Sequence, residues 1–276
     1  MTISIDDLEH AAAAGWRACQ EDRLGDWLLR AAEGFTGRAN SALAAGQPGL
    51  PLAEAIGKVC AWNAERGLPA MIAVPYPPGQ PSANPLDRVL AGLGWTIHTD
   101  AATVMTAAAE EVASRPAAAG TAGAAGATMA TWATWAASPA GETAAAIDAK
   151  PDEAWLARYH YRGQPLPPVA ARLVMSAPWQ AFGSVRAGGE TIAIGRVAHA
   201  GARAGLTAVE ADPRFRRMGL GAAVTSALAA AGAQRGASGI YLQVTDGNAG
   251  ARALYRRLGF TDHHGYHYRV APACRG

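Results

Sequence analysis

Apolar and polar positions along the first half of the chain predict strands interleaved with helices. Segments 25–33 and 38–45 are typical of two strands around a turn at 34–37. Pro51 then opens an amphipathic segment that stops at Gly67, which predicts a helix. Further strands are predicted at 70–74 and 102–107, with a second helix at 85–93 between them.

The second half repeats this order with more elements. A strand is predicted near 128–135, and one or two helices between Pro151 and Met175. Three antiparallel strands are predicted at 179–186, 191–199 and 205–211. A helix from Gly219 to Gly236, a strand at 239–245, a helix at 249–258 and a strand at 266–270 follow. This alternation predicts an α/β fold in two copies.

A stretch with almost no large side chain divides the chain near its middle. Between Glu110 and Gly126 the sequence EEVASRPAAAGTAGAAG has no usable period, and its composition is typical of a flexible linker. We therefore expect domains at 1–110 and 127–276, joined by a linker at 111–126. Each half is large enough to form a domain.

Composition excludes several classes of protein. Half of the residues are apolar, and eight Trp and seven Tyr argue against disorder. A formal net charge of +2 is too small to indicate nucleic acid or an anionic membrane as the partner. Three scattered cysteines show neither a disulfide framework nor metal-ligand spacing, so we expect no metal and a cytoplasmic location. The acidic N-terminal segment does not resemble a signal peptide.

A glycine-bearing turn leads from a predicted strand straight into the long helix. Such a turn leaves main-chain N–H groups unpaired at the positive end of the helix, where they can bind a phosphate. Gly219 and Gly221 permit close approach of a ligand, and Arg214, Arg216 and Arg217 add positive charge. Alone, this RxxGxG spacing is weak evidence for a phosphate site, because glycines often precede helices simply as caps.

A second motif follows the next predicted strand. The segment NAGARALYRRLGF begins with Asn248, a good N-cap, and ends its helix at Gly259. Together the two motifs resemble the GCN5-related N-acetyltransferase (GNAT) superfamily. Residues 216–221 match its (Q/R)xxGx(G/A) segment, and residues 248–260 match NxxAxxLYxxxGF at every named position. The resemblance covers roughly Thr128 to Val270.

The resemblance implies acetyl-CoA as the co-substrate and an N-acetyltransferase activity. The pyrophosphate is then expected on the main-chain amides of residues 217–222, the pantetheine arm along the strand end at 209–211, and a further contact from the next helix. The implied cofactor-binding residues are Val209, Glu210, Ala211, Arg216, Arg217, Met218, Gly219, Leu220, Gly221, Ala222 and Asn248.

The resemblance also gives Tyr255 a catalytic role, as the acid that protonates the departing CoA thiolate. A phenol with an unperturbed pKa of ~10 is protonated at neutral pH and can donate to a basic leaving group. The same residue also fits an aromatic side chain packed on its helix face. The general base stays open among Glu210, Asp246, His263, His264 and His267.

The first half is similar to a degenerate second copy. Its segment NPLDRVLAGLGW echoes residues 248–260 and places Leu90, which has no proton to donate, where the second half has Tyr255. The segment before Pro51 lacks the RxxGxG turn, and proline removes an N–H group. We therefore expect no catalysis and no CoA binding there. The arrangement resembles tandem acetyltransferases such as mycothiol synthase and related actinobacterial proteins.

The acceptor is not specified by the sequence. The leading hypothesis is the primary amine of a small molecule, attacked directly in a ternary complex by a monomer or homodimer without nucleic-acid or membrane partners. Alternatives are a protein lysine or N-terminal acetyltransferase, and a CoA-binding sensor without turnover. The segment GFTGRANS, residues 34–41, either lines the acceptor site or is an ordinary hairpin whose turn is satisfied by Asn40 and Ser41.

Overall fold

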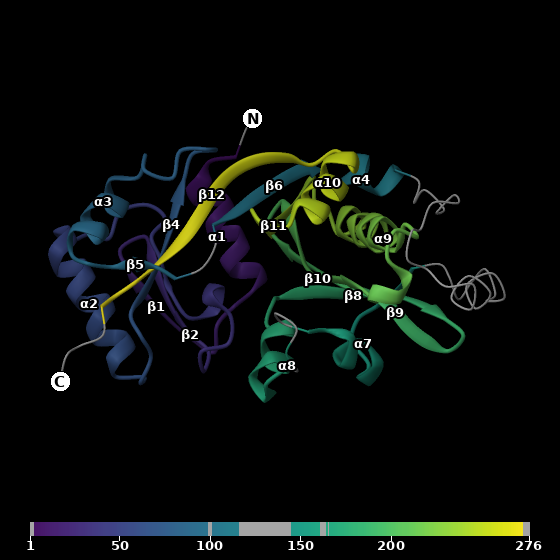
Figure 1. Cartoon of the computed structure of the whole chain (residues 1–276), viewed down its shortest axis with the longest axis horizontal. Helices are drawn as coiled ribbons and strands as arrows, with labels where there is room; N and C mark the ends of the chain where they lie inside the picture. Colours follow the sequence, from purple (N-terminus) through teal and green to yellow (C-terminus); the bar gives the residue numbers. More distant parts are fainter. Residues whose placement is uncertain (1–2, 99–100, 116–144, 161–163, 165, 273–276) are drawn as a thin grey trace.

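The strands of the chain join in one mixed, mostly antiparallel sheet flanked by helices (Figure 1). The structure, a computed structural model, describes residues 3–98, 101–115, 145–160, 164 and 166–272. In this part of the chain the sheet has 12 strands in the order β1-β2-β3-β4-β12-β6-β11-β10-β9-β8-β7, with β5 against β12. The predicted α/β class is confirmed.

The strands are β1 Gln20–Leu24, β2 Trp27–Ala31, β3 Ala42–Leu43, β4 Met71–Tyr76, β5 Thr96–Ile97, β6 Ala102–Ala108, β7 Ala146–Asp148, β8 Trp179–Ala187, β9 Glu190–Ala200, β10 Arg203–Ala211, β11 Gly239–Thr245 and β12 Thr261–Val270. The helices are α1 Ile5–Gly15, α2 Leu52–Ala64, α3 Pro85–Gly92, α4 Ala109–Ser114, α7 Glu153–Arg158, α8 Pro168–Val174, α9 Leu220–Gln234 and α10 Ala249–Arg257, with short 3-10 helices η1 Gly37–Ala39 and η2 Pro213–Phe215.

Two strands join the halves of the molecule, because each pairs with a strand of the other half. β6, from the first half of the chain, pairs along its whole length with β11 of the second half. β12, the last strand, pairs first with β6 and then with β4 of the first half. In Figure 1 these strands cross the centre of the molecule side by side. The main-chain hydrogen bonds of the sheet therefore run without a break from one half to the other.

The helices cover the two faces of this sheet. α2 and α3 pack on one face of the first half, and α4, α9 and α10 pack on one face of the second. α7 and α8 pack on the opposite face of the second half, around Trp155 and Phe182. Glycine makes the closest of these contacts, because a Cβ on Gly195 of β9 would lie 2.7 Å from side-chain atoms of α9.

Helix α1 crosses the junction of the halves and was not predicted from the sequence. Its Leu8 is fully buried against residues of both halves, on the face that also carries α7 and α8. The hydroxyl of Tyr241 on β11 donates to the carbonyl oxygen of Ala11, at 3.2 Å. A Cβ on Gly205 of β10 would lie 2.4 Å from this tyrosine ring, so glycine makes room for the contact.

The expected pair of strands at 25–33 and 38–45 is confirmed in part, because β2 and β3 pair antiparallel at Leu28 and Leu43, but both strands are shorter than predicted and the turn between them is longer. The observed hairpin joins β1 to β2 and turns at Gly25, whose φ is 58°. The sequence of β1, QEDRL, is polar because its side chains are mostly exposed, so it shows no alternation. Residues 32–41 form an irregular loop containing η1, and only residues 42–43 of the second segment form a strand.

Most elements predicted in the second half are confirmed. β8, β9 and β10 pair antiparallel as expected, and the helices between Pro151 and Met175 are α7 and α8. The expected strand near 128–135 lies outside the described residues. The expected linker 111–126 begins inside α4, where Val112 is fully buried, and its residues 116–126 also lie outside them.

Candidate active site

The sheet opens into a fork between two parallel strands, β10 and β11. Their pairing ends at Leu206 with Leu242. Ala208 then has a φ of 54°, and the register of β10 against β9 shifts between Thr207 and Glu210. This bulge turns β10 away from β11, because one extra residue bends a strand and interrupts its ladder. Within the described residues, β10 has no ladder partner on its β11 side from position 207 onward.

The predicted phosphate-binding turn stands directly beyond β10, at the start of α9. Arg217 and Gly219 have left-handed backbone angles, with φ of 66° and 81°. The first paired amide at this end of the helix is that of Ala223, which donates to the carbonyl oxygen of Gly219 at 2.9 Å. Among the described residues, the amides of positions 217–222 make no hydrogen bond. The turn is therefore a group of unpaired donors at a helix N-terminus.

Buried side chains fix this turn in place. Met218 and Leu220 are 3% and 2% exposed and belong to the core of the second half, which Ala222 joins on the next turn of the helix. A Cβ on Gly221 would lie 2.9 Å from the side chain of Leu254, so α10 lies close against the start of α9. The turn and α10 are thus held together as one unit.

The predicted residues of α10 have the expected local roles. Asn248 caps the helix, its side-chain oxygen accepting from the amide of Ala251 at 3.0 Å. Tyr255 is 7% exposed and meets Phe260 edge to face, with ring centroids 5.7 Å apart. Burial raises the pKa of Tyr255 to about 12, so its hydroxyl keeps its proton at neutral pH. The aromatic-packing interpretation holds, and it is compatible with a hydroxyl that serves as a donor.

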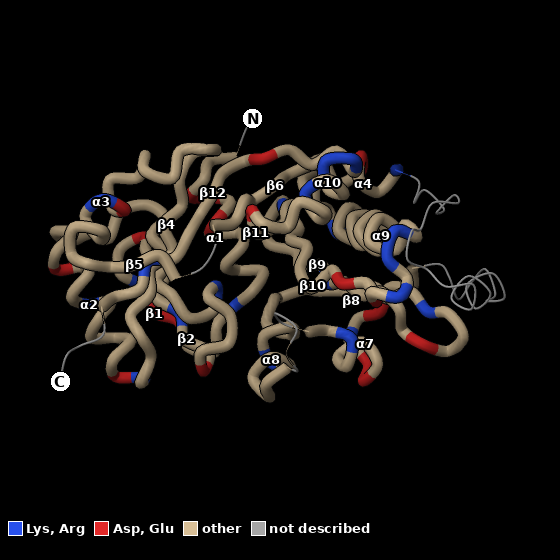
Figure 2. Tube along the Cα trace, in the orientation of Figure 1, with Lys and Arg blue, Asp and Glu red and all other residues tan. Residues whose placement is uncertain are grey.

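The arginines near the turn divide into two groups. Arg214 is bound by Asp212 and Glu190, with nitrogen–oxygen distances of 2.9 and 2.7 Å, so its charge is compensated within the protein. Arg216 and Arg217 are exposed beside the unpaired amides. Figure 2 shows positive charge along the segment that enters α9 and along α10. This distribution suits a ligand with several negative charges.

Glu210 lies on the side of the sheet opposite the turn. Val209 faces α9, since its side chain lies 3.4 Å from a Cβ built on Gly195. Glu210 faces α7 and accepts from the main-chain amide of His160 at 2.9 Å, with the His160 imidazole 3.3 Å away. The fork therefore has a group of unpaired main-chain amides on one face and a partly exposed carboxylate on the other.

The remaining candidates for a base are engaged in structural contacts. Asp246 accepts from Thr103 at 2.6 Å and from Arg252 at 3.2 Å. His264 is buried, with Nε2 2.7 Å from Glu9 of α1. Its Nδ1 lies 2.8 Å from Nδ1 of His263.

His267 belongs to a second buried cluster. Its Nε2 lies 2.5 Å from Asp87, which also accepts from Arg269 at 2.8 Å. Burial opposes ionisation of Asp87, but hydrogen bonds from these two partners outweigh it and lower the pKa of Asp87. The three histidines hold elements together instead of facing the fork.

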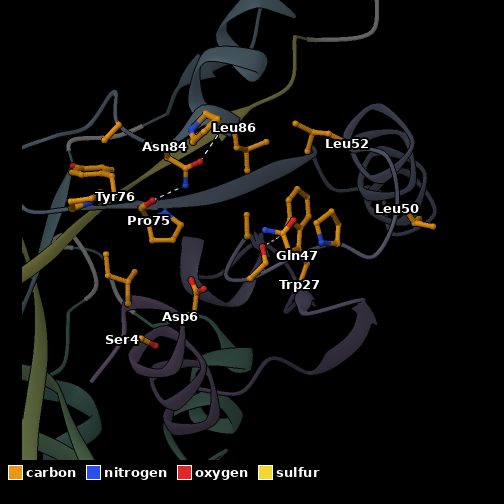
Figure 3. A pocket seen from close by; sticks show the side chains of 17 residues that line it. Ser4, Asp6, Trp27, Gln47, Leu50, Leu52, Pro75, Tyr76, Asn84 and Leu86 are labelled. Atoms are coloured by element: carbon orange, nitrogen blue, oxygen red, sulfur yellow. Dashed lines mark hydrogen bonds between the residues drawn. The ribbon is translucent and has the colours of Figure 1, made fainter. Parts of the chain in front are cut away.

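A second, smaller fork occurs in the first half. β3 pairs in parallel with β4 only at residues 42–43, and α2 and α3 follow these strands as α9 and α10 follow β10 and β11. A cavity of about 780 Å³ lies there, lined by the segment before α2, the end of β4 and the start of α3 (Figure 3).

The lining of this cavity differs from the fork of the second half. Its 17 residues include no Lys or Arg, and Asp6 contributes a carboxylate. Pro51 occupies the N-cap position of α2, where it offers no N–H donor and no side-chain cap. Asn84 caps α3 as Asn248 caps α10, and Figure 3 shows its amide turned to Pro75, to which it donates at 2.8 Å.

Leu90 is the structural equivalent of Tyr255. The amide of Trp95 donates to the carbonyl oxygen of Leu90 at 3.0 Å. The amide of Phe260 donates to the carbonyl oxygen of Tyr255 at the same distance. Leu90 is fully buried. The hydroxyl is thus missing from the first copy although the surrounding backbone is kept.

The described residues contain neither a metal-binding cluster nor a membrane-spanning helix. No group of three or more His, Cys, Asp or Glu side chains there is arranged to hold a metal ion. No helix in this part of the chain is both long and apolar enough to cross a bilayer.

The chain matches known proteins over nearly its full length. Residues 2–269 match the family described as "Probable histone acetyltransferase Rv0428c C-terminal". The chain is 31% identical over 281 residues to the Mycobacterium tuberculosis protein "Probable histone acetyltransferase Rv0428c", covering 99% of this chain and 75% of that protein.

Solved structures share the fold. A GCN5-related N-acetyltransferase from Kribbella flavida has a TM-score of 0.62 at 21% identity, covering 99% of this chain and 97% of that one. A tandem GNAT protein from the clavulanic acid biosynthesis pathway has a TM-score of 0.58 at 12% identity, covering 86% of this chain and 76% of that one. The chain thus belongs to the Rv0428c C-terminal acetyltransferase family and is an N-acetyltransferase of the GNAT superfamily with the tandem arrangement.

Proposed function

We propose that the second half transfers an acetyl group from acetyl-CoA to the primary amine of a small molecule, in a ternary complex at the fork of β10 and β11. The observation that carries this proposal is the placement of unpaired amides on one face of the fork and a carboxylate on the other. A donor and an acceptor can then meet in the gap between the strands.

The donor is bound from the α9 side. The amides of residues 217–222 receive the pyrophosphate at the positive end of α9, where Arg216 and Arg217 add charge. The free edge of β10 at residues 209–211 offers main-chain groups to the amides of the pantetheine arm. Asn248, at the start of α10, contacts the donor from the neighbouring helix.

The acceptor then approaches from the α1 and α7 face, because the donor occupies the other. Glu210 takes a proton from the acceptor ammonium, directly or through a water. The amine nitrogen attacks the thioester carbonyl, a C–N bond forms, and the C–S bond breaks. Tyr255 donates a hydrogen bond, and then its proton, to the departing sulfur. The nitrogen loses its second proton, which restores the Tyr255 phenol, and Glu210 releases its proton to water.

A protein acceptor is the second candidate, because the Mycobacterium tuberculosis relative is named a histone acetyltransferase. The same fork chemistry would serve a lysine side chain or an N-terminal amine. A CoA-binding sensor without turnover is the third, and it would retain the amides of residues 217–222 without needing Glu210 or Tyr255.

Amine-dependent release of the CoA thiol tests the transfer reaction. We expect release with small primary amines, and Glu210→Gln should lower kcat by about 10²–10⁴ while the Kd for acetyl-CoA is unchanged. The variant should recover activity as the pH rises, because the amine then loses its proton without help. Glu190→Gln is the control, because Glu190 is an exposed carboxylate that is bound to Arg214. If no amine accelerates release of the thiol, the proposal of an enzyme fails. Full activity of Glu210→Gln would exclude only the role of Glu210 as the general base.

The unpaired amides at α9 can be tested with two glycines of the same helix. Gly219 and Gly236 both have positive φ, of 81° and 95°, at opposite ends of α9. Alanine at either position costs about 1–2 kcal/mol of stability. We expect only Gly219→Ala to weaken acetyl-CoA binding as well, by about 10–100-fold, because it distorts the charge-assisted donors. Equal affinities of the two variants in calorimetry would show that the donor binds elsewhere.

One acetyl-CoA is expected to bind each chain. The cavity of the first half has no cationic lining, and Pro51 removes an N–H donor at the N-cap position of α2. Calorimetry on the whole chain should therefore give a stoichiometry near one. A stoichiometry near two, or a site that survives in Gly219→Ala with unchanged affinity, would contradict this expectation.

Removal of the Tyr255 hydroxyl tests the general acid. Tyr255→Phe keeps the ring against Phe260 but removes the proton, so kcat should fall by about 10²–10⁴ with little change in acetyl-CoA affinity. A donor with a more acidic thiol should restore the rate, because its sulfur leaves without protonation. Tyr76→Phe, in the first half, is the control. Full kcat of Tyr255→Phe, with chemistry rate-limiting, would make the residue purely structural.

A further inference from the structure

Two arginines stand at the point where the fork opens, on the face opposite α9. The first residues beyond the β10–β11 pairing are Thr207 and Gln243. Thr207 accepts from Nη1 of Arg196 at 3.3 Å, and Gln243 accepts from Nη1 of Arg38 at 2.9 Å. Arg196 comes from β9 of the second half, whereas Arg38 comes from η1 of the first half. The first copy thus places a cationic side chain at the fork of the second.

Trp16, at the end of α1, holds both guanidinium groups. Its ring centroid lies 5.0 Å from Cζ of Arg38 and 5.3 Å from Cζ of Arg196, and the ring is 1% exposed. An aromatic face attracts a guanidinium and fixes the plane in which it lies. The position of Arg38 is therefore set by an aromatic ring and an amide oxygen.

The loop that carries Arg38 is held rigidly. Asn40 is buried and makes hydrogen bonds of 2.7–2.9 Å to main-chain groups of residues 32–36. Ser41 donates to the carbonyl oxygen of Gly37 at 2.8 Å. Thr36 has a φ of 61°, a conformation that costs energy in a residue other than glycine. Asn40 and Ser41 thus satisfy the loop, as one of the two sequence interpretations expected, and the loop also reaches the fork.

The surroundings of Arg38 are rich in positive charge. Buried Arg30 donates to Ser41, and buried Arg196 donates to the carbonyl oxygens of Val174 and Gly15 at 2.6 and 3.0 Å. Within the described residues, neither Arg30 nor Arg196 forms an ion pair with a carboxylate.

Burial lowers the pKa of Arg30 and lowers that of Arg196 to about 10, so Arg196 stays charged at neutral pH. Glu9, the carboxylate that lines the same small cavity as Arg30 and Arg38, lies 2.7 Å from His264. Arg38 and Arg196 thus bring two guanidinium groups to the face of the fork that also carries Glu210.

We propose that the acceptor carries a carboxylate near its reacting amine and that Arg38 binds this carboxylate. The inference rests on the proposed function, which brings the acceptor to this face. A guanidinium matches a carboxylate with two parallel hydrogen bonds, and its position is already fixed before binding. The same charge repels the neighbouring cations of a lysine-rich peptide, so the fork favours a small amino acid-like acceptor over a basic protein tail.

Pairs of amines that differ only in a carboxylate test this proposal. L-Phenylalanine is compared with 2-phenylethylamine, and 6-aminohexanoate with pentylamine, by thiol release from acetyl-CoA. A lysine-rich peptide is a third type of acceptor. We expect wild type to prefer the carboxylate member of at least one pair by about tenfold or more in kcat/KM, and to use the peptide less well.

Variants of Arg38 distinguish a role in binding the acceptor's carboxylate from a structural role. Arg38→Gln should lower kcat/KM for the preferred carboxylate acceptor by about 10–100-fold, mainly by raising KM, and leave its carboxylate-free partner within about threefold. Arg38→Lys should retain part of the preference, because lysine keeps the positive charge but lacks the planar guanidinium group. Arg66→Gln is the matched control, since Arg66 also stacks on a tryptophan, Trp62, and donates to a glutamine, Gln20.

Each outcome has a distinct meaning. Equal use of both members of every pair by wild type, or preference for the lysine-rich peptide, overturns the proposal and leaves the transfer reaction intact. Equal losses for both members in Arg38→Gln assign Arg38 a structural role and also overturn it. No turnover with any amine or peptide, while acetyl-CoA binds, contradicts the proposed function and this inference with it.

Discussion

The end of the parallel pairing between β10 and β11 is the constraint on which the candidate site depends. Beyond Leu206 and Leu242 the strands diverge, and the bulge at Ala208 keeps them apart. A left-handed alanine costs about 1–2 kcal/mol, which the pairing of β10 with β9 on both sides of the bulge offsets. Beyond the bulge, the ordinary alternation of a strand sends Val209 and Glu210 to opposite faces, which we propose to be the donor side and the acceptor side.

The exchange of β6 and β12 makes the two halves depend on each other structurally. β11, one arm of the working fork, is held on its other edge by β6 of the first half. β12 in turn supplies β4 with a neighbour, and α1 packs over both halves. Removal of either half would expose the unpaired edge of a central strand. The first half is thus part of the frame of the second, and through Arg38 it reaches the fork itself.

The sequence predicted the elements with strong periodicity and the residues in short motifs. The turn at Gly219, the cap at Asn248 and the burial of Tyr255 lie within single local segments, so local rules suffice for them. Helix α1 was missed although Ser4 caps it and two aspartates occupy its first turn. β1 was missed because an exposed edge strand needs no apolar alternation. The strand exchange joins residues more than 130 positions apart, and no local pattern encodes such a pairing.

Side-chain roles across the fork depended on the same long-range geometry. A strand position alone does not say that Glu210 meets the amide of His160 or that Arg38 meets Gln243. An arginine within the apolar strand TIAIGRVAHA was a visible signal, because an arginine buried at that place needs hydrogen-bond acceptors from its neighbours.

The two forks share a backbone arrangement but differ in the chemical groups that they carry. Both have a parallel strand pair followed by two helices, an asparagine cap and the same hydrogen bond closing the second helix. They differ in the residues before the first helix, where Pro51 stands in place of a glycine turn, and in Leu90 in place of Tyr255. Pro51 removes one main-chain donor at the start of α2, and Leu90 has no hydroxyl that could give a proton. The fold tolerates both changes, because the replacement supplies the core contacts at each place. Leu90 is part of the core of the first half, as Tyr255 is part of that of the second. The chemistry that we propose therefore depends on a few side chains and amides at one fork, whereas the sheet is formed by both copies together.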